Sequence, residues 1–270
     1  MAAADGPVRG DISLLALRYA AAVRDGDADR TTARLYRFNT APPTPAQARL
    51  LGDPVAARQL LMAAAGLDRR GGGGEYTLTT EPATGWLYWR SAAGPRSGAV
   101  RTRTAGRPAA MRKLYITAKL DHLPLALRAV FQTARQSDIT VVKFGADYAN
   151  LRRPDRIVLY TRDRQQAEEV GAALRAALDG IPADMLPFAE RIAPAVFSGL
   201  DPPPPPATAA TRASWRGWLC QTMAEALHQA PPDSAELAVA AAMQHCHLLG
   251  LDPASWRVDD GFFAELPGAA

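Results

Sequence analysis

The sequence predicts an α+β fold in which an antiparallel or mixed sheet is flanked by helices and preceded by a small helical and hairpin region. Several short segments alternate between polar and apolar residues, which is the pattern of half-buried strands. Elsewhere, apolar residues recur every three or four positions, as on the buried face of a helix. The chain has 270 residues, of which 48% are hydrophobic and 21% charged, so it can build a substantial core and is neither disordered nor fibrous.

The first predicted region, residues 1–105, combines helices with one hairpin. A glycine run at 71–74 separates the helical spacing from two short segments rich in aromatic and β-branched residues. The expected elements are helices within 11–24 and 44–67 and a hairpin of 75–80 with 86–90, turning at Thr84 and Gly85. Residues 91–110 have no apolar period, so we interpret them as a linker or a mobile loop.

The second predicted region, residues 106–270, begins with the pattern strand, helix, two strands, helix. These five elements are expected at 113–120, 123–136, 139–145, 156–161 and 163–180. Alternation places Lys113, Tyr115 and Thr117 on one face of the first strand. Residues 146–155 form a loop dense in cations, and a proline-rich connector at 201–207 leads to a pair of amphipathic helices at 215–229 and 234–250.

Composition excludes several classes of protein. The first residues lack the cationic start and apolar stretch of a secretory signal, and no apolar run has the length of a membrane span. We therefore expect a cytoplasmic protein that does not bind a membrane. Two cysteines, Cys220 and Cys246, are too few for a disulfide scaffold. His245 and His247 point about 200° apart on a helix, so no metal site is expected.

The lysines are the most informative cations. The net charge is +4, but only three of the 31 basic residues are lysine, and all three lie between residues 113 and 143. Lysine can lose its proton near neutrality, whereas arginine cannot. Lys143 lies among Ile139, Val141 and Gly145 on its strand face, where poor solvation disfavours the ammonium, so it is the candidate base. The alternative is a strand-edge charge that deters aggregation.

Arginines follow Lys143 closely. Arg152, Arg153 and Arg156 would repel one another unless an anion binds there, and guanidinium groups bind phosphate oxygens in a bidentate manner. The alternative is that Arg153 and Arg156 form ion pairs with nearby carboxylates. The candidate partners are Asp147, Asp155 and Asp163.

Several short motifs occur in a characteristic order. These are KLYITA, VVKFGADYANLRRPDRIVLYT, GLDPP and SWRGWLC, within about residues 111–220. Together they resemble the HopA family of type III effectors and its relatives among the lyases of lanthipeptide and thioamitide biosynthesis. That family is similar to the phosphothreonine lyases, which eliminate phosphate from phosphothreonine or phosphoserine and leave a dehydro amino acid. The resemblance implies that residues 106–270 are a lyase domain.

The resemblance also implies roles for single residues. Lys143 would take the α-proton of the phosphorylated residue. Lys113, Arg153, Arg156 and Arg216 would hold the phosphate, and Tyr160 would orient the base or the substrate amide unless it is an ordinary core aromatic. The better known phosphothreonine lyases have a histidine, two residues after the first lysine, that acts as the general acid. This chain has Tyr115 at that position. The proton for the leaving oxygen comes from Tyr115 in the favoured interpretation, from His122, or from no residue at all.

The sequence hypothesis is therefore a phosphoserine/phosphothreonine lyase that acts on a precursor peptide of the lanthipeptide or thioamitide type and needs no cofactor or metal. A separate Ser/Thr kinase is expected as partner, because the chain has no phosphate-binding loop of the Gly-x-x-x-x-Gly-Lys type. The peptide leader is expected to dock on residues 1–105, and no nucleic acid is expected. The alternatives are a noncatalytic phosphopeptide or nucleic-acid binding module, an injected effector of the same family, or an assembly subunit of a modifying complex.

Overall fold

A computed structural model describes residues 11–64, 66, 76–81, 85–91, 111–203, 214–231 and 234–266. The predicted glycine run, the linker after residue 91 and most of the proline-rich connector lie outside these residues. The chain forms two compact units. Unit 1 consists of Met1–Phe38, Leu186–Arg191 and Gly199–Ala270, and unit 2 consists of Asn39–Met185 and Ile192–Ser198. These units are discontinuous in sequence, and the predicted functional division into residues 1–105 and 106–270 stays a prediction.

The described strands form one sheet of seven, in the order β1-β2-β4-β5-β3-β7-β6. They are β1 (Tyr76–Glu81), β2 (Trp86–Ser91), β3 (Met111–Ile116), β4 (Val141–Gly145), β5 (Ile157–Thr161), β6 (Glu190–Ala193) and β7 (Val196–Asp201). The pairings β1–β2, β2–β4, β4–β5 and β3–β5 are antiparallel. The predicted α+β class and the predicted hairpin are confirmed. The sequence analysis did not anticipate β6 and β7.

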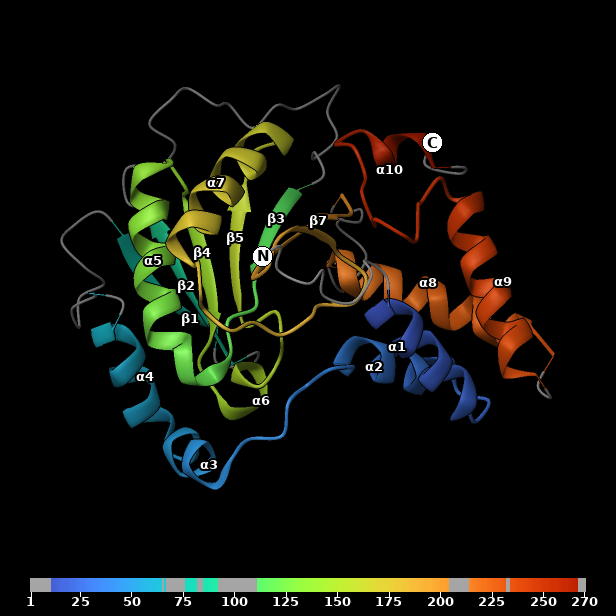
Figure 1. The fold of residues 1–270 in the computed structure, drawn as a ribbon, viewed down its shortest axis with the longest axis horizontal. Helices are drawn as coiled ribbons and strands as arrows, with labels where there is room; N and C mark the ends of the chain where they lie inside the picture. The colour runs from blue at the N-terminus through green and yellow to red at the C-terminus, as the bar shows by residue number, and fades with distance from the viewer. Residues whose placement is uncertain are drawn as a thin grey trace, which may run out of the picture. The chain divides into compact units, whose positions relative to one another are not determined.

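The helices of unit 2 include the two that were expected between the strands. They are α3 (Pro45–Gly52), α4 (Pro54–Ala64), α5 (Leu123–Gln136), α6 (Tyr148–Leu151) and α7 (Arg164–Ala177), with a 3₁₀ turn, η1, at Leu120–His122. The stretch 44–67 forms two helices because Pro54, which has no N–H to donate, begins a second helix after Asp53. Figure 1 shows α5 and α7 side by side against the central strands.

One face of the sheet carries the core of unit 2. Leu114, Val142 and Leu159 are fully buried in one row across β3, β4 and β5. Trp89 stacks on Phe144, with ring centres 5.2 Å apart. We call this side the apolar face, and α5 and α7 pack against it. Their buried stripes are Leu127, Val130 and Phe131 in α5, and Val170 and Leu174 in α7.

Unit 1 is mainly helical. Its helices are α1 (Asp11–Ala22), α2 (Ala28–Arg37), α8 (Trp215–Gln229), α9 (Ala235–Leu248) and α10 (Phe262–Glu265). The predicted C-terminal pair, α8 and α9, is confirmed, whereas α2 and α10 were not anticipated. Helix α2 packs on α8, and α9 packs on both α8 and α1.

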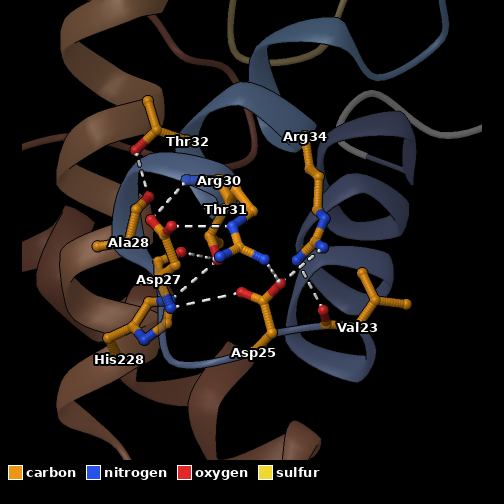
Figure 2. A network of polar contacts seen from close by, with 9 residues as sticks. All are labelled: Val23, Asp25, Asp27, Ala28, Arg30, Thr31, Thr32, Arg34 and His228. Carbon is orange, nitrogen blue, oxygen red and sulfur yellow. Dashed lines mark hydrogen bonds and ion pairs between the residues drawn. The ribbon is translucent and has the colours of Figure 1, made fainter.

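The α1–α2 turn is held by a polar network (Figure 2). The Asp25 carboxylate accepts from Arg30 and Arg34, each at 3.0 Å, and the hydrogen bond from Arg34 lowers the pKa of Asp25. Nearby, Oγ1 of Thr31 lies 2.9 Å from Nε2 of His228 on α8. This contact joins α2 to α8 within unit 1.

Candidate active site

The second face of the sheet carries the polar side chains, and we call it the polar face. Strand register places residues that pair across the strands on the same face. One row consists of Tyr88, Lys143, Val158 and Tyr115. The next row consists of Arg90, Val141, Tyr160 and Lys113. Four of the predicted site residues therefore lie in two adjacent rows of one face.

The two lysines of the polar face do not lie on adjoining strands. β5 lies between β4, which carries Lys143, and β3, which carries Lys113. Two strand spacings across the sheet and an offset of two residues along it separate their backbones by roughly 12 Å. Lys119 is exposed and lies beyond the end of β3, because this strand stops at Ile116 and not at residue 120.

Lys143 lies against two aromatic rings of β2. Its Nζ is 4.1 Å from the centre of the Trp86 ring and 5.2 Å from the centre of the Tyr88 ring. The side chain is half-buried. Aromatic faces attract a cation while they exclude water from one side of it, so the site both holds the amine and limits its hydration.

Arg153 follows α6 and forms the ion pair that the sequence analysis gave as an alternative. Its Nε and Nη2 donate to both carboxylate oxygens of Asp155, at 2.9 and 2.7 Å. Its Cζ lies 5.2 Å from the centre of the Trp86 ring. The Arg153 side chain keeps 19% of its surface exposed, whereas Asp155 keeps 5%. The phosphate-binding role of Arg153 stays a prediction.

Arg156 is 1% exposed and lies at the start of β5. Its three nitrogens donate to the carbonyl oxygens of Arg153 and Ala118, both at 2.6 Å, and to Oδ2 of Asp184 at 2.7 Å. Burial lowers the pKa of the Arg156 guanidinium from its usual value, and the attraction of Asp184 opposes this change. These contacts hold together three separate stretches of unit 2. The phosphate-binding role of Arg156 stays a prediction.

The partner of Arg156 differs from those considered in the sequence. Asp184 comes from the segment after α7, 28 residues along the chain. Asp147 and Asp163, two of the carboxylates considered in the sequence, are N-cap residues. They accept backbone N–H groups in the first turns of α6 and α7.

The row of Lys113 is more buried. Lys113 is 7% exposed, and its Nζ lies 4.8 Å from the centre of the Tyr160 ring. Tyr115 is 3% exposed in the row of Lys143. One position further on the polar face, Oγ1 of the fully buried Thr117 has no hydrogen-bond partner among the described residues. The acid role of Tyr115 and the orienting role of Tyr160 stay predictions, as does the alternative of His122, which lies in the 3₁₀ turn before α5.

Arg216 belongs to unit 1, in the first turn of α8. It donates to the carbonyl oxygens of Pro187, at 3.3 Å, and Tyr36, at 2.9 Å. Its Cζ lies 5.0 Å from the centre of the Tyr36 ring, and the residue is 1% exposed. Within unit 1, Arg216 therefore connects α8 to the last turn of α2 and to the segment before β6. Its phosphate-binding role stays a prediction.

Two glycines allow α6 to lie close to the polar face. Gly85 has a φ of +65°, and a Cβ there would lie 1.8 Å from Oδ2 of Asp147. A Cβ at Gly145 would lie 2.8 Å from the backbone carbonyl carbon of Asn150. Larger residues at either position would force α6 outward, and Arg153 follows directly after this helix.

Sequence reasoning missed three residues of the polar face and its border. They are Trp86, Tyr88 and Asp184. Alternation within WLYWR places Trp86 and Tyr88 on one face of β2, which is a usable signal. The pairing of β2 with β4, which brings the two rings to Lys143, joins segments about 55 residues apart and has no local signal.

The described residues contain no cluster of three histidine, cysteine or carboxylate side chains that could hold a metal ion. Within the same ranges, no helix has the length and apolar character needed to cross a membrane. Cys220 and Cys246 are buried thiols, and burial raises the pKa of Cys246 to about 12.

In sequence, the chain matches no known family profile and no curated protein. In structure, it is similar to an effector protein of Pseudomonas syringae pv. tomato strain DC3000, with a TM-score of 0.59, 13% identity and coverage of 92% of this chain and 96% of that chain. An effector protein of Pseudomonas syringae pv. syringae strain 61 gives 0.58 and 12%, with coverage of 94% and 99%. The chain has the fold of these effectors.

The Salmonella plasmid virulence C protein is more distant, with a TM-score of 0.40, 11% identity and coverage of 88% of this chain and 99% of that chain. The likeness to the two Pseudomonas effectors confirms the fold that the motif resemblance implied. At these identities the structural likeness concerns the fold alone. The residues of the polar face carry the information on chemistry.

Proposed function

We propose that this protein is a phosphoserine/phosphothreonine lyase, which eliminates phosphate from a phosphorylated precursor peptide to give dehydroalanine or dehydrobutyrine. The observation that carries the proposal is the polar face, where two of the three lysines lie in adjacent rows and Arg153 lies beside the same indole as Lys143. The assignment to lanthipeptide or thioamitide biosynthesis rests on the resemblance of the sequence motifs.

The elimination needs a base, an acid and cations. The neutral Lys143 amine takes the α-proton, the electron pair of that C–H bond forms the Cα–Cβ double bond, and the Cβ–O bond breaks. Phosphate leaves with the electrons of the Cβ–O bond, and the Tyr115 phenol protonates the leaving oxygen. A positioned base and acid and cations around a departing dianion are sufficient for this reaction, so no cofactor is required.

The proposed phosphate ligands differ in exposure. Arg153 keeps 19% of its side chain exposed and Lys113 is 7% exposed, whereas Arg156 and Arg216 are each 1% exposed. All three arginines donate to carbonyl or carboxylate oxygens, so a phosphate would have to compete with these acceptors. We assign the main phosphate contacts to the two more exposed residues, Lys113 and Arg153, with Arg156 and Arg216 as supporting cations. The ring of Tyr160 lies beside the Lys113 amine, and Tyr160 orients the part of the substrate near this lysine.

The proposal includes two partners. A separate Ser/Thr kinase phosphorylates the peptide in the cytoplasm, and the precursor peptide docks through its leader on residues 1–105.

A noncatalytic phosphopeptide binding module is the second candidate. The two aromatic rings at Lys143 favour the charged ammonium, and an ammonium cannot accept a proton. A protein that only binds phosphate would use Lys143 in this charged form.

One experiment separates the two candidates. The protein is incubated with matched phosphothreonine and phosphoserine peptides, with and without a leader, and mass spectrometry follows the loss of phosphoric acid. The lyase converts the peptides to dehydro products, and the rate rises when the leader is present. Bound peptide that stays intact would identify the binding module, and elimination from unrelated phosphoproteins without any leader effect would support an injected effector.

A further inference from the structure

Trp86, the first residue of β2, has two cations against its indole ring. The Nζ of Lys143 lies 4.1 Å from the ring centre, and the Cζ of Arg153 lies 5.2 Å from it. The two side chains come from different segments, one from the middle of β4 and the other from the turn after α6. A single aromatic side chain therefore sets the spacing between an amine and a guanidinium that have different tasks in the elimination.

The indole is itself held in place. Trp86 is 5% exposed, and its backbone pairs with Gly145 in the β2–β4 ladder. Gly145 brings no side chain to the polar face, where the Asn150 backbone would lie 2.8 Å from a Cβ. The indole is therefore a fixed surface against which the two cations are placed.

The two cations depend on this ring to different degrees. Arg153 is also held by both oxygens of Asp155 and lies 3.5 Å from Oδ1 of Asn150 through its Nη1. Lys143 ends in an amine on a flexible four-carbon chain, which is confined by contact with the rings of Trp86 and Tyr88. Removal of the indole should therefore disturb Lys143 more than Arg153.

We propose that Trp86 is a positioning residue, which holds the Lys143 amine within reach of the substrate α-carbon and beside the phosphate-binding Arg153. This inference rests on the proposed function. Loss of the ring leaves the amine less confined, which lowers kcat.

The contact itself can be tested without any catalysis. The chain has only three lysines, so protein labelled with ¹³C at lysine Cε gives three signals, and the one that disappears in Lys143→Arg belongs to Lys143. The nearby indole should shift this signal upfield in the wild type. Trp86→Leu should remove the upfield shift, whereas Trp86→Phe, which keeps an aromatic face, should retain part of it.

The consequence for the reaction is tested on the same variants. Trp86→Leu should lower kcat by about 10- to 100-fold, because small displacements of a catalytic group have effects of this size. Trp86→Phe should recover most of the rate, and the affinity for an intact phosphopeptide should change little because Asp155 holds Arg153. Rates are divided by the folded fraction of each variant, measured by circular dichroism, so that a loss of folding is not counted.

The outcomes are distinct. A wild-type Lys143 signal without an upfield shift would overturn the contact, and an unchanged kcat in Trp86→Leu would overturn the positioning role alone. A wild-type protein that binds the phosphopeptide but never eliminates phosphate would overturn the proposed function and this role together.

Discussion

Two neighbouring residues of β4 show how the faces of the sheet differ. Lys143 points to the polar face, against Trp86 and Tyr88, while Phe144 points to the apolar face, stacks on Trp89 and is 1% exposed. One strand thus contributes alternate residues to the candidate site and to the apolar core. This division implies that substitutions on the polar face should change function with little change in folding, and that the opposite should hold for the apolar face.

The largest effect is expected at Lys143. Lys143→Ala should lower the rate of elimination by about 10²- to 10⁴-fold, which is the usual contribution of a general base. The variant should still bind phosphopeptide, because the proposed phosphate ligands remain. Single-turnover mass spectrometry measures the rate, and calorimetry measures the affinity.

The exposed Lys119 provides the matched control, since Lys119→Ala removes the same charge away from the polar face. Its rate should equal that of the wild type. An unchanged rate for Lys143→Ala would show that Lys143 is not the base. It would also contradict the functional role proposed for the polar face.

The next effect concerns stability at the adjacent residue. Phe144→Ala leaves a cavity between Trp89 and Phe131, so the free energy of unfolding should fall by about 3–5 kcal/mol. Urea denaturation followed by circular dichroism measures this loss. The folded fraction should keep its rate of elimination, and a rate loss as large as that of Lys143→Ala would contradict the separation of the two faces.

Substitution of Asp184 tests whether Arg156 stabilises the fold or binds phosphate. Asp184→Ala leaves the buried Arg156 guanidinium without its counter-ion, which should lower the free energy of unfolding by about 2–4 kcal/mol. If Arg156 mainly holds the fold, phosphopeptide affinity per folded molecule should stay the same. A clear gain in affinity, measured by calorimetry, would instead show that the freed guanidinium binds phosphate.

The smallest effect comes from one substitution made on each face. Val142→Thr introduces a hydroxyl into the core and should cost about 1–3 kcal/mol of unfolding free energy. Val158→Thr places the same hydroxyl on the polar face, between Lys143 and Tyr115, where polar neighbours can bond with it, so it should cost less than Val142→Thr. Equal losses in thermal denaturation would show that the polar face is packed as a second core.

Local patterns predicted much of the fold. The alternation of residues 113–116, the helical stripes of α5 and α7, and the aromatic hairpin all follow from side-chain periodicity and formed as expected. The short strands β6 and β7 and the helix α2 were missed. Helix α2 has only two buried residues, Thr31 and Leu35, so it lacks the apolar stripe that identifies a helix in a sequence.

The candidate site was predictable only in part. Alternation correctly placed Lys113 and Tyr115 on one face of β3, and these residues pair with Tyr160 and Val158 of β5. The order of strands was not accessible, because the insertion of β5 between β4 and β3 depends on long-range pairing. For the same reason, the choice of Asp184 as the partner of Arg156 and of Trp86 as the neighbour of Lys143 could be seen only in the folded chain.

The close approach at Gly145 has a practical consequence for mutational surveys. Gly145→Ala adds one methyl group, 2.8 Å from the Asn150 backbone, and alters no charge and no residue of the polar face. The displaced α6 would carry Arg153 with it, so the variant would lose activity as if a substrate contact had been removed. A survey that ranks positions by lost turnover would therefore score this glycine alongside the catalytic groups, and only a comparison of its backbone with that of the wild type would reveal the indirect cause.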